Sequence, residues 1–430
     1  MQSRRHFLTV TAGLAGSGAL GVAASRPASQ EQPDGPPVAW ERRYDQPVNL
    51  TDVVAIGGGF VLSGGTGANA DPSGDGWLGR VDAEGELDWQ ATDDHEGWND
   101  YRNLALGPGG PVAAGLSNAT DGSFVQARTI DGDARWDAVV GADADADVLD
   151  VARTVDGVAV AGQTYSTASD SAVWAAGLGD GGEVRWTFEA DPSDSLDSAY
   201  ALCGHPDGGV VLGGRMPGGD GGAAFLARVD ASGTEQWRRR PEADTTDAVA
   251  RTSDGFLVGG AARSGDGLSP ALLSVDRRGQ VQWRRSYQTD TQVGFVSEVA
   301  PLADGGAVIV GSVGTPTEFR PWVARTDAEG GRRWERKLSA AGGLGNAVAV
   351  SSGGITVAGR REEDAGPVGA LVRLSEDVEP LSQPALGADD DEDDDDDASA
   401  SGPTGLGTVL SGAAAAGATL GAARWLSNRD

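Results

Sequence analysis

Seven tryptophans recur along this 430-residue chain at intervals of 46 to 51 residues. A repeat of this length, copied seven times, is typical of arrays in which each copy packs its apolar face on the next copy. A large ring that occurs once per copy is well suited to packing between neighbouring copies. We therefore interpret the series as structural docking residues, and its members are Trp40, Trp89, Trp136, Trp186, Trp237, Trp283 and Trp334.

Each repeat contains four short apolar stretches that are separated by Gly, Asp and Asn. In the first copy the predicted strands are Asp52–Ile56, Phe60–Thr66, Trp77–Asp82 and Leu87–Ala91. Strands of five to seven residues joined by such turns indicate an antiparallel four-stranded sheet. The 67 glycines of the chain suit the many turns that this arrangement needs.

The ends of the array decide how many sheets the chain can build. The seventh copy supplies three strands, Asn346–Val350, Ile355–Gly359 and Gly369–Leu374, and no Trp strand follows them. The strand around Trp40, which precedes the first copy, can supply the missing fourth strand and leave no open sheet edge. The sequence thus predicts an all-β, seven-bladed β-propeller over residues 38–377, closed by its N-terminal strand.

A common phrase, Asp-x-x-Gly-x-x-x-Trp, leads into the last strand of several copies. It occurs at Asp82–Trp89, Asp230–Trp237, Asp276–Trp283 and Asp327–Trp334. The phrase resembles the repeat of pyrroloquinoline-quinone-like (PQQ-like) propellers, and the resemblance covers roughly Val38–Leu374. It implies that the Trp ring docks between neighbouring blades, and it is more specific for the repeat than for quinone binding.

The N-terminus resembles a twin-arginine signal, which exports proteins already folded. Arg4 and Arg5 precede the small and apolar stretch Thr9–Ala24. We expect residues 1–24 to be the signal peptide, residues 25–37 to be a linker, and the twin-arginine translocase to be a partner during export. The expected location is extracellular or at the cell surface.

The net charge of the chain indicates the kind of solvent to which the protein is adapted. The formal net charge is −31, and Lys337 is the single lysine among 33 basic residues. This composition resembles the proteins of extremely halophilic archaea, whose carboxylate-rich surfaces stay hydrated in concentrated salt. A surface of this sign repels nucleic acid, so we expect no nucleic-acid partner.

The C-terminal part has a different composition from the repeats. We interpret residues 378–403, which include nine consecutive acidic residues from Asp389 to Asp397, as a low-complexity linker. Residues 404–424 are a candidate membrane-anchoring helix, because Gly405–Ala423 carries no charge and arginines follow it. The order of these parts resembles the C-terminal sorting tails of haloarchaeal surface proteins, although Pro403-Thr404-Gly405 replaces their Pro-Gly-Phe.

A polar residue precedes or opens the predicted inner strand of every copy. Because inner strands line the central channel, these residues are candidates for a ring at one channel mouth that binds a cation or a hydroxylated ligand. Capping of turns and strands is the alternative explanation. The seven candidates are Asp52, Asn103, Asp150, Ser198, Asp247, Glu298 and Asn346.

Other residues that could carry chemistry are sparse. Cys203 is the single cysteine, which excludes an intramolecular disulfide. The loop around Trp98 mixes polar and aromatic residues and is either a solvated connection or a ligand-contacting rim. We predict no metal site and no catalytic residue, since neither a metal-ligand set nor a nucleophile motif is recognisable.

These observations predict a non-enzymatic binding or scaffold propeller at the cell surface of a halophilic archaeon. Its expected partner is an extracellular protein or a glycan, and we expect no cofactor. The alternative is a quinone-dependent, PQQ-like dehydrogenase, which would need PQQ and Ca²⁺, or a glycan-acting enzyme.

Overall fold

The computed structural model describes residues 35–67, 74–93, 99–117, 122–165, 171–190, 198–216, 223–265, 267–338 and 343–382. The predicted signal peptide with Arg4 and Arg5, the Asp389–Asp397 run and the candidate anchoring helix lie outside the described residues. Within the described ranges, no helix combines the length and the apolar character that a membrane span requires.

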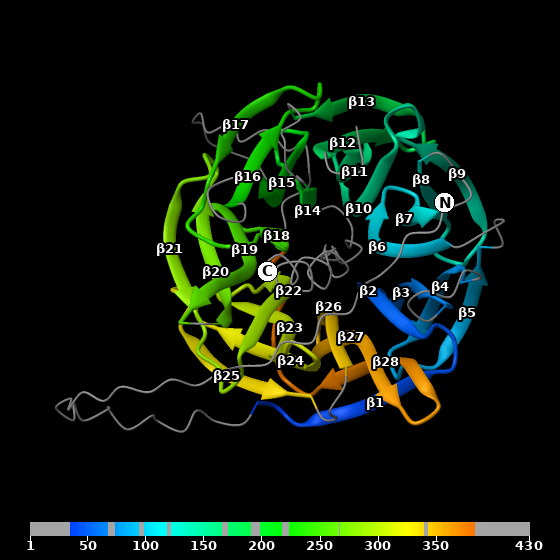
Figure 1. The fold of residues 1–430 in the computed structure, drawn as a ribbon. Helices are drawn as coiled ribbons and strands as arrows, with labels where there is room; N and C mark the ends of the chain where they lie inside the picture. The colour runs from blue at the N-terminus through cyan, green and yellow to red at the C-terminus, as the bar shows by residue number, and fades with distance from the viewer. Residues whose placement is uncertain are drawn as a thin grey trace, which may run out of the picture. The chain divides into compact units, whose positions relative to one another are not determined.

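The seven predicted four-stranded sheets are confirmed, and they form a closed ring of blades around a central axis (Figure 1). We number the blades in the order in which their inner strands occur. Blade 1 contains, from the inner to the outer strand, β2 (Asn49–Ile56), β3 (Gly59–Gly65), β4 (Gly76–Asp82) and β5 (Leu87–Thr92). Blade 2 contains β6 (Asn99–Gly107), β7 (Gly110–Ser117), β8 (Ser123–Arg128) and β9 (Ala134–Val140). Blade 3 contains β10 (Ala146–Arg153), β11 (Gly157–Tyr165), β12 (Ser171–Gly179) and β13 (Val184–Glu189).

Blades 4 to 7 follow the same order. Blade 4 contains β14 (Ser198–Gly204), β15 (Val210–Met216), β16 (Ala223–Val229) and β17 (Glu235–Arg239), and blade 5 contains β18 (Ala248–Arg251), β19 (Gly255–Ser264), β20 (Gly267–Asp276) and β21 (Val281–Ser286). Blade 6 contains β22 (Val293–Pro301), β23 (Ala307–Thr315), β24 (Glu318–Thr326) and β25 (Arg332–Lys337). Blade 7 contains β26 (Gly343–Ser351), β27 (Gly354–Glu363), β28 (Gly366–Leu374) and β1 (Val38–Tyr44).

Blade 7 is assembled from both ends of the described chain, as the sequence predicts. Strand β1 pairs antiparallel with β28, so that Trp40 lies opposite Arg373. The backbone N–H of Ser375 donates to the carbonyl of Pro37 at 2.9 Å. The two chain segments therefore build the connection that a continuous turn builds in the other blades, and the ring closes without an open edge (Figure 1).

The core of the propeller lies between blades. Each large apolar cluster combines buried side chains of two adjacent sheets; one cluster joins Tyr287 of blade 5 to Trp322 of blade 6. Middle strands are buried on both faces, and all nine residues of β12 are buried. This burial explains why the middle strands read as continuous apolar runs in the sequence.

The chain continues to pack on the ring after residue 377, where the sequence predicts the linker to begin. Val378 is buried in the cluster shared by blades 6 and 7. Pro380 forms a bridge with Leu302, and the N–H of Leu381 donates to the carbonyl of Pro301 at 3.1 Å. These contacts involve isolated residues rather than a strand, so no periodic pattern marks them in the sequence.

Candidate functional site

The seven polar residues predicted to form a channel ring are all buried, but they do not share one position. Every inner strand except β18 has a register shift caused by one bulged residue. Asp52, Asn103, Asp150 and Glu298 follow the bulged residue directly. The other three candidates lie earlier, with Asn346 at the bulge, Asp247 just before β18, and Ser198 at the start of β14.

Except for Asp247, which accepts the hydroxyl of Thr245 in its own blade, these side chains bond a neighbouring blade. Asp52 of blade 1 accepts the N–H of Leu104 in blade 2 at 2.8 Å. Asn346 of blade 7 donates to the carbonyl of Leu50 in blade 1 at 2.7 Å, and so links the last blade to the first. A buried polar side chain that finds such a partner avoids the cost of an unsatisfied group.

Further bonds of the same kind join other pairs of blades. The N–H of Val348 in blade 7 donates to Glu298 in blade 6. The amide of Asn103 donates to the carbonyl of Leu149 in blade 3, and the hydroxyl of Ser198 in blade 4 donates to a side chain of blade 3. Inner strands are thus held together by side chains that differ from blade to blade.

The carboxyl groups of the inner strands lie in a poorly solvated environment. Burial raises the pKa of Asp52, Asp150 and Glu298 well above the ordinary range, and the charge of Asp52 raises the pKa of the other two further. Burial also raises the pKa of Asp247 to about 7, against the effect of the hydrogen bond from Thr245. Protonation of these groups therefore accompanies folding.

A metal site does not follow from this acidic ring. Within the part of the chain that the structure describes, no three His, Cys, Asp or Glu side chains are close enough to share a metal ion. The carboxyl groups of Asp52, Asp150 and Glu298 instead accept hydrogen bonds from backbone N–H groups. Their arrangement can hold blades in register and take up protons.

The seven tryptophans of the repeat lie at the same position on the seven outer strands. Trp136 belongs to blade 2, and its ring packs on Gly182 of blade 3. Its indole N–H donates to the carbonyl of Asp180, also in blade 3, at 2.7 Å. Trp334 packs in the same way on Gly35, which precedes β1, and donates to Glu376 at 3.0 Å. Each of these contacts joins one blade to the next.

The loop singled out around Trp98 falls largely outside the described residues, which include Asp93 before it and Asn99 after it. The hydroxyl of Tyr101 donates to Asp93 at 3.1 Å. Cys203 is half-buried, and burial raises the pKa of its thiol to about 12, so it stays protonated at neutral pH.

A second aromatic position became apparent only in the three-dimensional structure. On the third strand of five blades, a Trp or Phe lies opposite a glycine of the second strand. The five pairs are Gly64–Trp77, Gly115–Phe124, Gly162–Trp174, Gly214–Phe225 and Gly311–Trp322. Blades 5 and 7 have alanine there instead, in the pairs Gly260–Ala271 and Gly359–Ala370.

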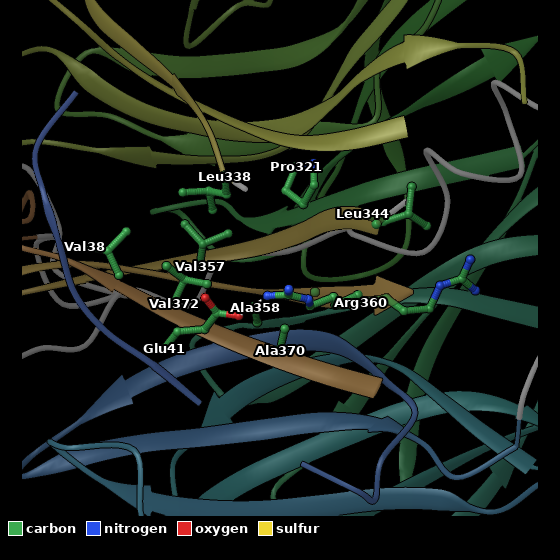
Figure 2. A pocket seen from close by; sticks show the side chains of 13 residues that line it. Val38, Glu41, Pro321, Leu338, Leu344, Val357, Ala358, Arg360, Ala370 and Val372 are labelled. Atoms are coloured by element: carbon green, nitrogen blue, oxygen red, sulfur yellow. Dashed lines mark hydrogen bonds and ion pairs between the residues drawn. The ribbon is translucent and has the colours of Figure 1, made fainter. Parts of the chain in front are cut away.

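A pocket open to solvent, with about 40 Å³ of space for the centre of a water-sized molecule, lies where blade 7 lacks this aromatic ring. Ala370 lines it, together with apolar side chains of blade 7 and with Pro321 and Leu338 of blade 6. Figure 2 shows Leu338 and Pro321 on one side of the pocket and Val357 and Val372 on the other. The replacement of an aromatic residue by Ala370 is the one sequence signal that points to the pocket, and it requires the strand register to be recognised.

The pocket also has a charged edge. Glu41 of β1 pairs with Arg361 of β27 at 2.7 Å, and both residues line the pocket with Arg360. Glu41 and Arg361 are each about a quarter exposed, with side-chain exposures of 27% and 26%. The site therefore combines apolar walls with groups that can bond a polar atom of a guest, as is common for ligand pockets.

Comparisons with known proteins assign no family to the chain. No protein-family model matches the chain, and no curated protein matches it. Among solved structures, Sqt1 of Chaetomium thermophilum is 14% identical, with 77% of this chain and 97% of that chain covered and a TM-score of 0.48. A Bacteroides caccae protein of unknown function is 14% identical, with coverages of 65% and 94% and a TM-score of 0.41.

The sialidase of Trypanosoma rangeli is 9% identical, with 75% of this chain and 53% of that chain covered and a TM-score of 0.35. At these identities and scores, the similarities carry no argument about function.

Proposed function

We propose that this protein is a non-enzymatic binding or scaffold propeller, and that the pocket between blades 6 and 7 is its contact site. The observation that carries the proposal is the pocket beside Ala370, at a position that a buried aromatic side chain occupies in five other blades. Inner-strand polar side chains such as Asp52 and Asn346 are engaged in bonds between blades, which makes them supports of the ring.

The chemistry of the pocket favours a polypeptide partner. Val357, Val372 and Leu338 present apolar surface, while Glu41 and Arg360 lie beside it. A protein segment can insert one apolar side chain and bond these charged groups with its own polar atoms. A glycan offers fewer apolar groups for such walls, so we place an extracellular protein ahead of a glycan.

The display of this site outside the cell rests on the sequence signals at the two termini. We propose export by the twin-arginine route and retention by residues 404–424. Deletion of residues 402–430 should then release the protein into the medium, as followed by immunoblotting of cell and medium fractions. Protein of the full chain that is already free in the medium would contradict the anchor.

A pocket-filling variant tests the binding function. Ala370→Trp places a tryptophan at the position where blades 1, 3 and 6 have one. The substitution should abolish capture of a partner from a cell-surface extract. The partner must then be purified and shown to bind the native chain and not the variant. Val184→Trp is the matched control, because Val184 is 49% exposed and belongs to blade 3.

The alternative functions give different results in the same assays. Reconstitution with PQQ and Ca²⁺ should produce no quinone absorption band and no alcohol or sugar oxidation. A bound chromophore with such activity would contradict a non-enzymatic role. Binding of a glycan array that survives Ala370→Trp would place the contact site elsewhere on the propeller.

A further inference from the structure

The buried tryptophans of blades 1 and 6 define what the pocket of blade 7 lacks. Trp77 and Trp322 are almost completely buried, and each faces the preceding blade. Trp322 lies beside Tyr287 of blade 5, with 6.1 Å between the ring centroids. Trp77 likewise belongs to a cluster that includes Tyr44 of blade 7.

The indole N–H groups of both tryptophans have equivalent acceptors. Trp77 donates to Gln90 at 3.0 Å, and Trp322 donates to Glu335 at 2.8 Å. Gln90 and Glu335 each follow the docking Trp of their own outer strand directly. The corresponding residue of blade 7 is Glu41, which follows Trp40 and lines the pocket.

The opposite wall of the pocket is equivalent as well. Tyr44 and Tyr287 lie four residues after Trp40 and Trp283 on their outer strands. Four residues after Trp334, blade 6 has Leu338, which lines the pocket. Blade 7 thus has the second-strand glycine, the acceptor and the apolar wall, while Ala370 replaces the aromatic side chain.

We infer that this pocket binds an indole ring, which enters beside Ala370 and donates its N–H to the carboxylate of Glu41. This inference rests on the proposed function and names the chemical group that the site recognises. A Cβ on Gly79 would lie 2.3 Å from the ring of Trp77 in blade 1, and Val372 is the equivalent residue of blade 7. The guest ring therefore lies against the side chain of Val372 and farther toward the pocket mouth than Trp77 does in its own blade.

The ion pair of Glu41 is compatible with this role. Glu41 contacts Arg43 and Arg361 through Oε1, so we assign Oε2 as the acceptor of the guest. Blade 6 provides the precedent, because Glu335 pairs with Arg332 and accepts the indole N–H of Trp322 through the same carboxylate. A charge-assisted bond of this kind is stronger than one to a neutral acceptor.

We assign the indole ring to a tryptophan side chain of the polypeptide partner proposed above. Trp425 of the same chain, which lies outside the described residues, is the alternative source that the experiment distinguishes. The experiment separates these sources by using the full chain and its Trp425→Ala variant. N-acetyl-tryptophanamide is the probe, and its binding is followed by titration calorimetry.

If the indole comes from a partner, both proteins should bind the probe with a dissociation constant of about 0.1–1 mM. If Trp425 occupies the pocket, only the Trp425→Ala variant should bind it. Either result supports an indole site. Absence of binding by both proteins would overturn the inference, as would binding that persists in the Ala370→Trp variants of both.

The role of Glu41 is tested with a probe that cannot donate. N-acetyl-1-methyltryptophanamide should bind about tenfold more weakly than the parent compound, because its ring nitrogen carries no proton. Glu41→Leu should weaken the parent compound by about the same factor and leave the methylated compound unchanged. Glu41→Gln should retain most of the affinity, since Gln90 accepts the indole N–H in blade 1.

These outcomes separate the inference from the proposed function. A partner that is lost on Ala370→Trp, together with no binding of the indole probe, would preserve the binding function and reject the indole. Equal affinities for the parent and methylated probes would reject Glu41 as the acceptor. Circular dichroism and thermal unfolding of each variant establish that the ring is folded.

Discussion

Blades 6 and 7 are built on the same plan, and their third strands carry Trp322 and Ala370 at equivalent positions. Trp322 fills the space between blades 5 and 6, and its N–H is bonded by Glu335. Ala370 leaves a cavity between blades 6 and 7, although Glu41 and Leu338 stand in the equivalent places. The comparison teaches that a repeat can open a pocket through the loss of a side chain, while the blades around it keep their packing.

The largest expected effect comes from making blade 6 resemble blade 7. Trp322→Ala should lower the free energy of unfolding by about 3–5 kcal/mol, because a buried aromatic ring is lost and a cavity remains. Chemical denaturation measures the change. Added indole should recover part of the stability through binding to the native state. A loss below 1 kcal/mol would show that the ring at this position is dispensable.

The second comparison concerns the turn that receives the docking Trp of the preceding blade. Gly330 has a φ of +74°, and a Cβ atom there would lie 2.5 Å from the ring of Trp283. In blade 7 the turn is divided between the chain ends, and a Cβ on Gly35 would lie 2.8 Å from Trp334, without a left-handed φ.

Gly330→Ala should therefore lower the free energy of unfolding by about 2–3 kcal/mol, and Gly35→Ala should lower it by about 1 kcal/mol. The difference arises because only the substitution at Gly330 also strains the backbone. Thermal and chemical unfolding of both variants measure the difference. Equal losses would indicate that steric contact with the Trp ring dominates at both positions.

The bond from blade 6 to blade 7 should depend on pH. Burial raises the pKa of Glu298, so its contribution to stability is complete below the unfolded value of about 4.3 and declines as the pH rises toward the folded value. Glu298→Gln keeps an acceptor for the N–H of Val348 and removes the titratable proton of the Glu298 carboxyl group. The slope of unfolding free energy against pH should change by up to about 1.4 kcal/mol per pH unit.

Chemical denaturation at several pH values above 4.3 tests this expectation. Asn346→Asp is a useful counterpart, because it adds a titrating group to the bond between blades 7 and 1. An unchanged slope for Glu298→Gln would mean that Glu298 is ionised in the native state as it is in the unfolded state, so that folding takes up no proton there.

The smallest expected effect is the reverse change in blade 7. Ala370→Trp should raise the free energy of unfolding by about 1 kcal/mol, because the ring fills the cavity and its N–H can bond to Glu41. Val184→Trp, on the exposed surface of blade 3, should leave stability unchanged within about 0.5 kcal/mol. Destabilisation by Ala370→Trp would show that Val372 already occupies the space of the ring.

The fold could be predicted because its main connections repeat in the sequence. The docking Trp occurs at a regular interval, and the orphan strand around Trp40 accounts for closure. The inner-strand residues could be recognised as polar, but their partners could not, since Asp52 bonds a backbone group 52 residues away in the next blade. Their different positions relative to the bulged residue emerged only from the strand register.

The sequence by itself determined the number of blades, the position of the closing strand and the docking role of the repeated tryptophans, because each depends on a period along the chain. Only the tertiary structure decided where the pocket lies. Its walls come from β1, near the start of the described chain, and from β24, β27 and β28, near its end, and these strands meet only when the ring closes. A missing side chain leaves no motif, and becomes visible only beside the equivalent positions that are filled.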